Sequence, residues 1–368
     1  MSESHENLRS SSYFWPAEWH PHDATWISWP HNPKTWPGRM EPIPDAFERF
    51  IRTLAEVEPV HVLAGPAEAA REAHRRLDGA KNVRLFDFAT NDCWVRDYGP
   101  TFVIESETGK VVGVHWVYTA WGGKYPPFDE DAKNGARICE AMGIPRVASP
   151  LVCEGGGLET DGEGTLLTTT SCLQSASRNP ERSPAWITQH LSEMLGVTKV
   201  IWLEGTELDG DDTDGHIDQL ARFVAPGRVV VAARGIEVDT NIESLQSMKQ
   251  QLSEVTDARG RKLELIDLPT PPPRWINGQR VPESYCNFYI ANGIVLVPTF
   301  QHRPSDERAI GILKEQFPYH RIVPLDAADM IWGLGAFHCG SQQQPRCARE
   351  EMGVRSEESA SFNPYAAG

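Results

Sequence analysis

Cys339 is the strongest candidate for a nucleophile in this chain of 368 residues. It follows the segment GLGAFH, in which small residues would let a substrate approach the thiol closely. A single cysteine is more often a small buried hydrophobic residue, and Cys139, inside an expected helix, fits that description better. The sequence therefore predicts a reactive thiol at Cys339 and a structural one at Cys139.

His216 is the candidate proton carrier, because it follows a run of aspartates in the segment DGDDTDGHIDQL. Nearby negative charges favour the protonated imidazole, which could then donate a proton. A histidine that only hydrogen-bonds a loop is the alternative. In a strand, side chains two residues apart point to the same face. If HID belongs to a strand, His216 and Asp218 share one pocket and Ile217 faces away.

Asp97 is a further candidate carboxylate and lies in the segment WVRDYGP. Trp94 and Tyr98 flank it, so its carboxylate could lie beneath a wall of aromatic rings. A salt bridge from Asp97 to Arg96 or to another arginine is the competing interpretation.

A thiol, an imidazole and two carboxylates together suit the chemistry of a guanidinium group. Its N–H edges match carboxylates bidentately, it stays charged at neutral pH, and its central carbon is electrophilic toward a thiolate. The chain has no serine nucleophile elbow, GxxxxGK phosphate loop, HExxH pair or GxGxxG fingerprint. A zinc site of His216, Asp218 and Cys339 is conceivable, but the closely spaced ligand pairs typical of zinc are missing.

The elements that must position these residues follow one repeated order. A polar, glycine-rich cluster leads into a β-rich run, a turn, a second β-rich run and often a helix. Strands are expected at 101–105, 111–118, 228–234, 263–269 and 321–325, and helices at 129–143, 241–255 and 306–317. A strand at 24–30, a helix at 46–57 and a strand at 60–65 lie near the start, whereas the cluster at 333–339 lies near the end. One unit is therefore expected to join both ends of the chain.

The polar clusters recur at intervals of 52 to 71 residues, marked by Asp97, Glu154, His216, Asn287 and Cys339. The intervals indicate about five related units, and five units closed in a ring would aim every cluster at one centre. An ordinary α/β protein whose glycine-rich turns merely look alike is the alternative.

Five ordered motifs resemble those of a known family: NDCWVRDYGPTFV, AWGGKYPPFDED, EGGG followed by DGEGTLLTT, DDTDGHIDQLARF and GLGAFHCGSQQQP. Together they resemble the agmatine deiminase family, whose members include bacterial proteins similar to peptidyl-arginine deiminases, in the guanidine-modifying superfamily. The resemblance extends from WPAEWHPHDATWISWP through QQQP, most of the chain. It implies an α/β fold, the five-bladed α/β-propeller (pentein) of pseudo-symmetric ββαβ units around a central active site.

The resemblance also implies a covalent mechanism in which Cys339 attacks the guanidinium carbon. His216 protonates the departing ammonia and then activates the water that hydrolyses the thiouronium intermediate. Asp97 and Asp218 bind and orient the guanidinium, and neither a metal nor an organic cofactor is needed. The further residues expected to line the pocket or orient these groups are Trp94, Glu154, Gly155 and Gly156.

One departure from the family pattern leaves the substrate open. Members commonly have GGGNIHC where this chain has GLGAFHC, so Ala336 stands where an asparagine amide is usual. The expected reaction is agmatine to N-carbamoylputrescine plus ammonia, a step of putrescine synthesis. A peptidyl-arginine or free arginine deiminase giving citrulline is the alternative, ahead of an amidinotransferase or a noncatalytic guanidine-binding protein.

Composition agrees with a small cationic partner rather than a polymer. The net charge is -16 and no basic run appears, which argues against nucleic acid. No run of about 18 apolar residues suggests a membrane span, and the first residues lack the features of a signal peptide, so a cytoplasmic protein is expected. Seven cysteines without a CxxC pair suggest reduced thiols.

The expected domain organisation is simple. Residues 1–12 form a flexible N-terminus, residues 13–345 a single catalytic domain, and residues 346–368 a polar C-terminal tail. A homo-oligomer would be unsurprising at this size.

Overall fold

One order of strands recurs in five sheets of the computed structural model, which describes residues 12–235, 237 and 239–347. In each of these sheets, one strand pairs antiparallel with a second, and the second pairs parallel with a third. Parallel neighbours need a crossover connection, and a helix lies in every one of these connections. The protein therefore has the α/β fold that the sequence predicts.

The strands are grouped as follows. The first sheet holds β1 (Tyr13–Phe14), β5 (Thr101–Glu105), β6 (Val111–Val117) and β7 (Arg146–Val152). The second holds β10 (Lys199–Leu203), β9 (Thr165–Thr169) and β8 (Glu159–Thr160), and the third β11 (Ala221–Ala225), β12 (Arg228–Ala233) and β13 (Glu264–Pro269). The fourth holds β16 (Tyr289–Ala291), β17 (Ile294–Thr299) and β18 (Arg321–Asp326). The fifth holds β19 (Ser341–Pro345), β2 (His22–Ser28), β3 (Val60–Leu63) and β4 (Val83–Phe86), and a hairpin pairs β14 (Trp275–Ile276) with β15 (Gln279–Arg280).

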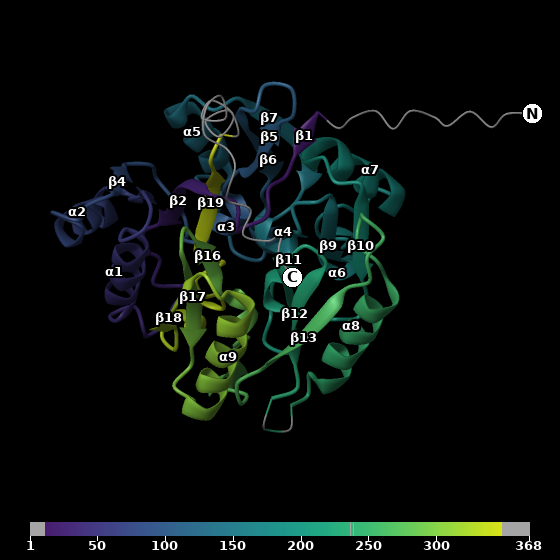
Figure 1. Ribbon diagram of the computed structural model, residues 1–368. Helices are drawn as coiled ribbons and strands as arrows, with labels where there is room; N and C mark the ends of the chain where they lie inside the picture. The colour runs from purple at the N-terminus through teal and green to yellow at the C-terminus, as the bar shows by residue number, and fades with distance from the viewer. Residues whose placement is uncertain (1–11, 236, 238, 348–368) are drawn as a thin grey trace, which may run out of the picture.

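The long helices cover the sheets from outside. They are α1 (Ile43–Leu54), α2 (Ala67–Arg76), α5 (Asp131–Met142), α7 (Pro184–Leu195), α8 (Ile242–Glu254) and α9 (Arg303–Gln316). Figure 1 shows them around the periphery, with most strands nearer the middle. The buried faces of helices and strands form one large hydrophobic core and a smaller one, and Trp26, Trp29 and Trp36 are fully buried in the large core.

The two ends of the chain meet in the fifth sheet. Strand β19 runs antiparallel to β2, with Ser341 opposite Ile27 and Gln343 opposite Thr25, and the two strands lie side by side in Figure 1. The predicted unit that joins both ends of the chain is thus confirmed. The expected strands and helices quoted above also begin and end within three residues of the observed ones.

The segment HID is not a strand, so that prediction is wrong. Ile217–Gln219 form a short 3-10 turn, η2, and the following strand starts only at Ala221. Turn hydrogen bonds run from the Gln219 N–H to the His216 carbonyl (3.3 Å) and from the Leu220 N–H to the Ile217 carbonyl (2.9 Å). The turn satisfies these backbone groups locally, and it leaves the side chains at its start free to point toward the site.

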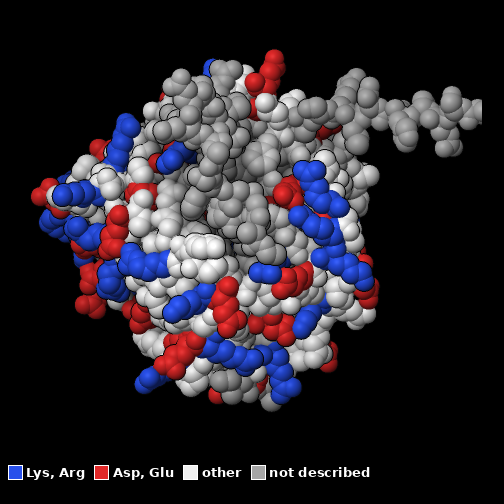
Figure 2. All heavy atoms as spheres, in the orientation of Figure 1, with Lys and Arg blue, Asp and Glu red and all other residues white. Residues whose placement is uncertain are grey.

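Charged side chains cover the surface in mixed sign. On the face shown in Figure 2, Lys and Arg lie interspersed with Asp and Glu over the lower half. Exposed pairs such as Arg321 with Glu56 and Arg228 with Glu264 contribute about 0–1 kcal/mol each. Among the described helices, none has the length and apolar character needed to cross a membrane.

Candidate active site

In each of the five sheets, a polar residue lies two to five positions before the strand that opens the antiparallel pair. These residues are Asp97 in the turn α3 (Val95–Tyr98) before β5, Glu154 before η1 (Gly155–Gly157) and β8, His216 before η2 and β11, Asn287 in η3 (Tyr285–Asn287) before β16, and Cys339 before β19. The turn α3 contacts η1, η1 contacts η2, η2 contacts η3, and α3 also contacts β19. The same position in five sheets therefore delivers one polar side chain each to a common place.

Three of the predicted site residues, Asp97, His216 and Asp218, meet around Gly156, and Cys339 joins them through Asp218. The Gly156 N–H donates to Asp97 Oδ1 at 2.9 Å, and His216 Nδ1 lies 3.6 Å from the same oxygen. The Cys339 thiol donates to Asp218 Oδ2 at 3.3 Å. A methyl group at Gly156 would lie 2.6 Å from His216 Nδ1, 2.8 Å from Asp97 Oδ1 and 3.1 Å from Asp218 Oδ2. Only a glycine leaves room for the three side chains at this point.

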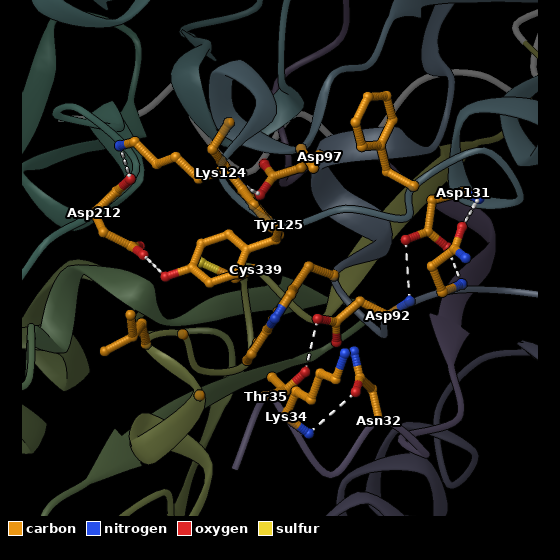
Figure 3. Close-up of a pocket in the computed structure, with 18 of the residues that line it drawn as sticks. Asn32, Lys34, Thr35, Asp92, Asp97, Lys124, Tyr125, Asp131, Asp212 and Cys339 are labelled. Atoms are coloured by element: carbon orange, nitrogen blue, oxygen red, sulfur yellow. Dashed lines mark hydrogen bonds between the residues drawn. The ribbon is translucent and has the colours of Figure 1, made fainter. Parts of the chain in front are cut away.

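A cavity of about 590 Å³ opens onto this cluster. Asp97, Trp94 and Cys339 line it, and Figure 3 shows Cys339 and Asp97 behind Tyr125. His216, Asp218, Glu154, Gly155 and Gly156 are buried behind the wall and do not line the cavity as it stands. Of the predicted substrate-binding residues, the structure therefore places only Asp97 and Trp94 at the cavity surface.

His216 is held between carboxylates that lie far from it in the sequence. Its Nε2 is 3.7 Å from Glu154 Oε2, and its Nδ1 faces Asp97. Burial opposes a charge on this ring, but the Asp97 charge and the contacts with Cys172 and Glu154 raise the pKa of His216 well above its usual range. The sequence predicts an electronegative setting that favours the protonated imidazole, and the raised pKa of His216 agrees with that prediction.

The local aspartates that motivated this prediction have other partners. Asp214 binds Arg178 and Lys124 at 2.7 and 2.8 Å, and Asp211 accepts hydrogen bonds from two backbone N–H groups of its own loop. Asp212 accepts a hydrogen bond from the Tyr125 hydroxyl, as Figure 3 shows.

The pKa values of the two aspartates around the thiol shift in opposite directions. Burial, together with the Asp218 and Glu154 charges, raises the pKa of Asp97 to about 6 despite the nearby His216. Burial also acts on Asp218, but the hydrogen bond and charge of His338 outweigh it and lower the pKa of Asp218. Burial and both aspartates raise the pKa of Cys339 well above that of a free thiol. The resting nucleophile is therefore a protonated thiol beside an ionised carboxylate.

Asn287 is a site residue that the sequence analysis used only as a marker of the repeat. Its Nδ2 donates to Cys339 Sγ at 3.1 Å, and its Oδ1 accepts from the N–H groups of Ala336 (3.1 Å) and Cys339 (3.2 Å). Its place in the repeated polar cluster was the available signal. The amide side chain that contacts the nucleophile is therefore that of Asn287, and Ala336 contributes only its backbone N–H to this group.

Trp121, in the motif AWGG, was also missed. Its Nε1 donates to Asp97 Oδ2 at 3.0 Å from a backbone with φ of 57°, in the left-handed region that a tryptophan rarely adopts. The aromatic wall beside Asp97 is thus made by Trp94 and Trp121. Arg96 points elsewhere, to Glu18 (3.2 Å) and Gln343 (2.7 Å), so the competing salt bridge with Asp97 is not formed.

One cluster among the described residues has metal-ligand spacing, and it is not the set considered from the sequence. Ligand atoms of Glu154, Cys172 and His216 all lie within 4.8 Å of one another. Arg178 Nε already donates to both Glu154 oxygens, at 2.8 and 3.1 Å. The Arg178 guanidinium is therefore already paired with the Glu154 carboxylate, and its positive charge opposes the binding of a metal cation there.

Comparison with known proteins identifies a matching family and several similar proteins. The family model for Porphyromonas-type peptidyl-arginine deiminase matches residues 14–345. A relative named agmatine deiminase, from Ectopseudomonas mendocina, is 38% identical over 92% of this chain and 96% of its own length. The solved agmatine deiminase of Enterococcus faecalis superposes with a TM-score of 0.84 at 32% identity, covering 92% of this chain and 98% of that one.

A solved agmatine deiminase of C. jejuni with substrate bound has the same TM-score, 0.84, at 27% identity and covers 94% of this chain and 99% of that one. The matches span nearly the whole length of both partners, and the family resemblance read from the five motifs is confirmed. The chain therefore belongs to the agmatine deiminase family of Porphyromonas-type peptidyl-arginine deiminases.

Proposed function

We propose that this protein hydrolyses agmatine to N-carbamoylputrescine and ammonia through a covalent intermediate on Cys339. The observation that carries the proposal is a buried pair of carboxylates, Asp97 and Asp218, beside a cavity-lining thiol, with no described arginine bound to either. Asp218 Oδ1 is buried without a hydrogen-bond partner in the described structure. The unpaired oxygen of Asp218 can accept a hydrogen bond from an incoming cation, and a guanidinium supplies both the charge and the N–H groups.

The mechanism follows from the contacts of the thiol and the imidazole. Guanidinium binding brings a positive charge beside Cys339 and lowers its raised pKa, so the thiol loses its proton to solvent and attacks the central carbon. His216, protonated at rest, donates its proton to the departing ammonia, which leaves a thiouronium on Cys339. The neutral imidazole then takes a proton from water, the hydroxide adds to the same carbon, and the carbon–sulfur bond breaks to release the urea product.

The outer part of the cavity favours an amine tail over a carboxylate tail. The ionisable residues that line it are Asp92, Asp97, Asp131 and Asp212 among the acids, of which burial raises the pKa of Asp131 well above its usual range, and Lys34 and Lys124 among the bases. Lys124 is already paired with Asp214 at 2.8 Å, and no arginine lines the cavity within the described residues. Arginine would bring a second anion into this acidic space, whereas agmatine brings a second cation.

We further propose that the five sheets are pseudo-symmetric ββαβ blades of a five-bladed α/β-propeller around the site. The recurring sheet order and the chain of contacts from α3 to η3 support this arrangement. Residues 13–345 would then act as one catalytic domain; residues 1–11 and 348–368 of the proposed termini lie outside the described residues. A cytoplasmic location and a homo-oligomer remain part of the proposal.

The substrate is tested by ammonia release from agmatine, free arginine and an arginine-containing peptide at equal concentrations. We expect kcat/KM for agmatine to exceed that for arginine by at least about 100-fold, because a second carboxylate would enter a pocket whose described lining holds four aspartates and two lysines, one of them already paired with Asp214. Preference for the peptide would instead assign peptidyl-arginine deimination, the activity that the family model's description names. The absence of ammonia release from all three substrates would reject the proposal.

Gly156→Ala is expected to lower kcat/KM for agmatine at least tenfold. The added methyl would overlap His216 Nδ1 and Asp97 Oδ1 at 2.6 and 2.8 Å, and a misplacement of about 1 Å in a catalytic group can cost 100-fold. Gly311→Ala is the matched control, because no atom lies within 4 Å of a methyl at that position in α9. Equal steady-state kinetics for the two variants would remove Gly156 from the site.

A further inference from the structure

His338 lies between two buried carboxylates and joins them. Its Nδ1 is 2.7 Å from Asp218 Oδ2, and its Nε2 is 2.9 Å from Glu18 Oε2. His338 is 1% exposed, Asp218 is fully buried, and Glu18 is 5% exposed. Glu18 and His338 are separated by 320 positions in the chain, so the contact depends on the meeting of the two chain ends in the fifth sheet.

Glu18 is itself held firmly. Its Oε1 accepts from the Ile290 N–H at 2.8 Å and lies 2.9 Å from Arg222 Nη2, while its Oε2 lies 3.2 Å from Arg96 Nη2. Burial works against this charge, but Arg222, His338 and Arg96 together lower the pKa of Glu18. The far side of the His338 ring is therefore anchored by a stable anion.

The two oxygens of Asp218 have different surroundings. Oδ2 accepts from His338 Nδ1 and from the Cys339 thiol, at 2.7 and 3.3 Å. Oδ1 has no partner among the described residues. His338 thus fixes the rotation of the carboxylate, so that one oxygen faces the nucleophile and the other is left without a protein partner in the described structure.

We propose that His338, anchored by Glu18, is a positioning residue that orients the Asp218 carboxylate between the Cys339 thiol and the incoming guanidinium. The role of Asp218 toward substrate rests on the function proposed above, whereas its contact with the thiol does not. His338 touches neither the cavity nor the thiol in a hydrogen bond, so it acts through Asp218.

Several other groups lie close to Asp218, His338 and the thiol. The thiol is surrounded by Asp218, Asp97, Asn287 and Gln219, whose amide lies 3.8 Å from the sulfur. The His338 carbonyl accepts from Arg96 Nε at 3.2 Å, and the His338 charge also acts on Glu159. Of these, Asp97 titrates near neutral pH, with a pKa of about 6.

The first test measures the pH profile of kcat/KM for agmatine in three variants. His338→Ala should lose about 100-fold at pH 7. The fall of kcat/KM at acidic pH should also begin at a higher pH and become steeper, because the pKa of Asp218 then lies close to that of Asp97. His338→Asn keeps an amide donor near the place of Nδ1 and should recover at least tenfold. His338→Gln, whose amide reaches toward Glu18, should not.

A second test needs no substrate. The rate at which iodoacetamide alkylates Cys339 is followed by mass analysis of its peptide across a range of pH. The pH at which this rate increases should be higher in His338→Ala than in the wild type. The Asp218 charge beside the sulfur has then lost its compensating partner. A shifted alkylation profile in a protein inactive on agmatine would keep the positioning role and reject the proposed reaction.

The proposal is overturned if His338→Ala keeps kcat/KM within threefold of the wild type with an unmoved acid limb and alkylation profile. It is equally overturned if the Asn and Gln variants lose activity and melting temperature together, with both pH profiles unmoved. That outcome would assign His338 a purely structural role.

Discussion

Replacing Cys339 with serine is expected to lower ammonia release from agmatine by at least about 1,000-fold. The environment is built around a sulfur, which accepts a hydrogen bond from Asn287 at 3.1 Å and donates one to Asp218 at 3.3 Å. A serine hydroxyl would keep these partners, but a hydroxyl ionises far less readily than a thiol. Among the described residues, no neutral base contacts this position. The measurement is steady-state ammonia release in the presence of a metal chelator.

The matched control for the nucleophile is Cys347→Ser. Cys347 is partly buried, lies after the last strand, and its thiol donates to the Gly109 carbonyl. This variant should keep the wild-type rate and should still be alkylated at Cys339 by a haloacetamidine. Substantial turnover by Cys339→Ser, with correct folding shown by its melting temperature, would exclude the covalent mechanism.

Asp97→Asn and Asp218→Asn are each expected to lower kcat/KM by about 100-fold or more. Loss of a charge-assisted hydrogen bond to a buried cation costs about 3 kcal/mol, and each 1.36 kcal/mol corresponds to a factor of ten. Asparagine keeps the shape of the side chain, so the change removes charge rather than volume. Asp129→Asn is the control, because Asp129 is exposed and pairs only with Lys133 in the described contacts.

The pH profile separates the two carboxylates. Asp97 has a pKa raised to about 6, so kcat/KM of the wild type should fall as the pH drops through 6 and Asp97 loses its charge. Asp218 has a lowered pKa and stays ionised there. In Asp97→Asn the limb near 6 should disappear from the residual activity. Persistence of that limb would assign it to another group.

The local sequence was sufficient for the elements and for the order of the site. Alternating and helical hydrophobic patterns placed strands and helices within three residues, because burial of one face is decided by nearest neighbours along the chain. Polar clusters at regular intervals marked Asp97, His216 and Cys339, because each of these residues lies shortly before the first strand of its sheet. The one local error, a strand at HID, arose because alternation over three residues also fits a turn.

Tertiary structure alone decided what surrounds these residues. His216 takes its charge from Asp97 and Glu154 rather than from the aspartates beside it in the chain, and Asp97 receives its hydrogen bond from Trp121. The contact of Glu18 with His338 joins opposite ends of the sequence. Such buried polar contacts are strong only where water is excluded, and packing of distant segments determines where that happens. Residue types and their spacing therefore indicated the kind of chemistry. The packing of the five sheets determined which charged groups set the pKa values of the site residues.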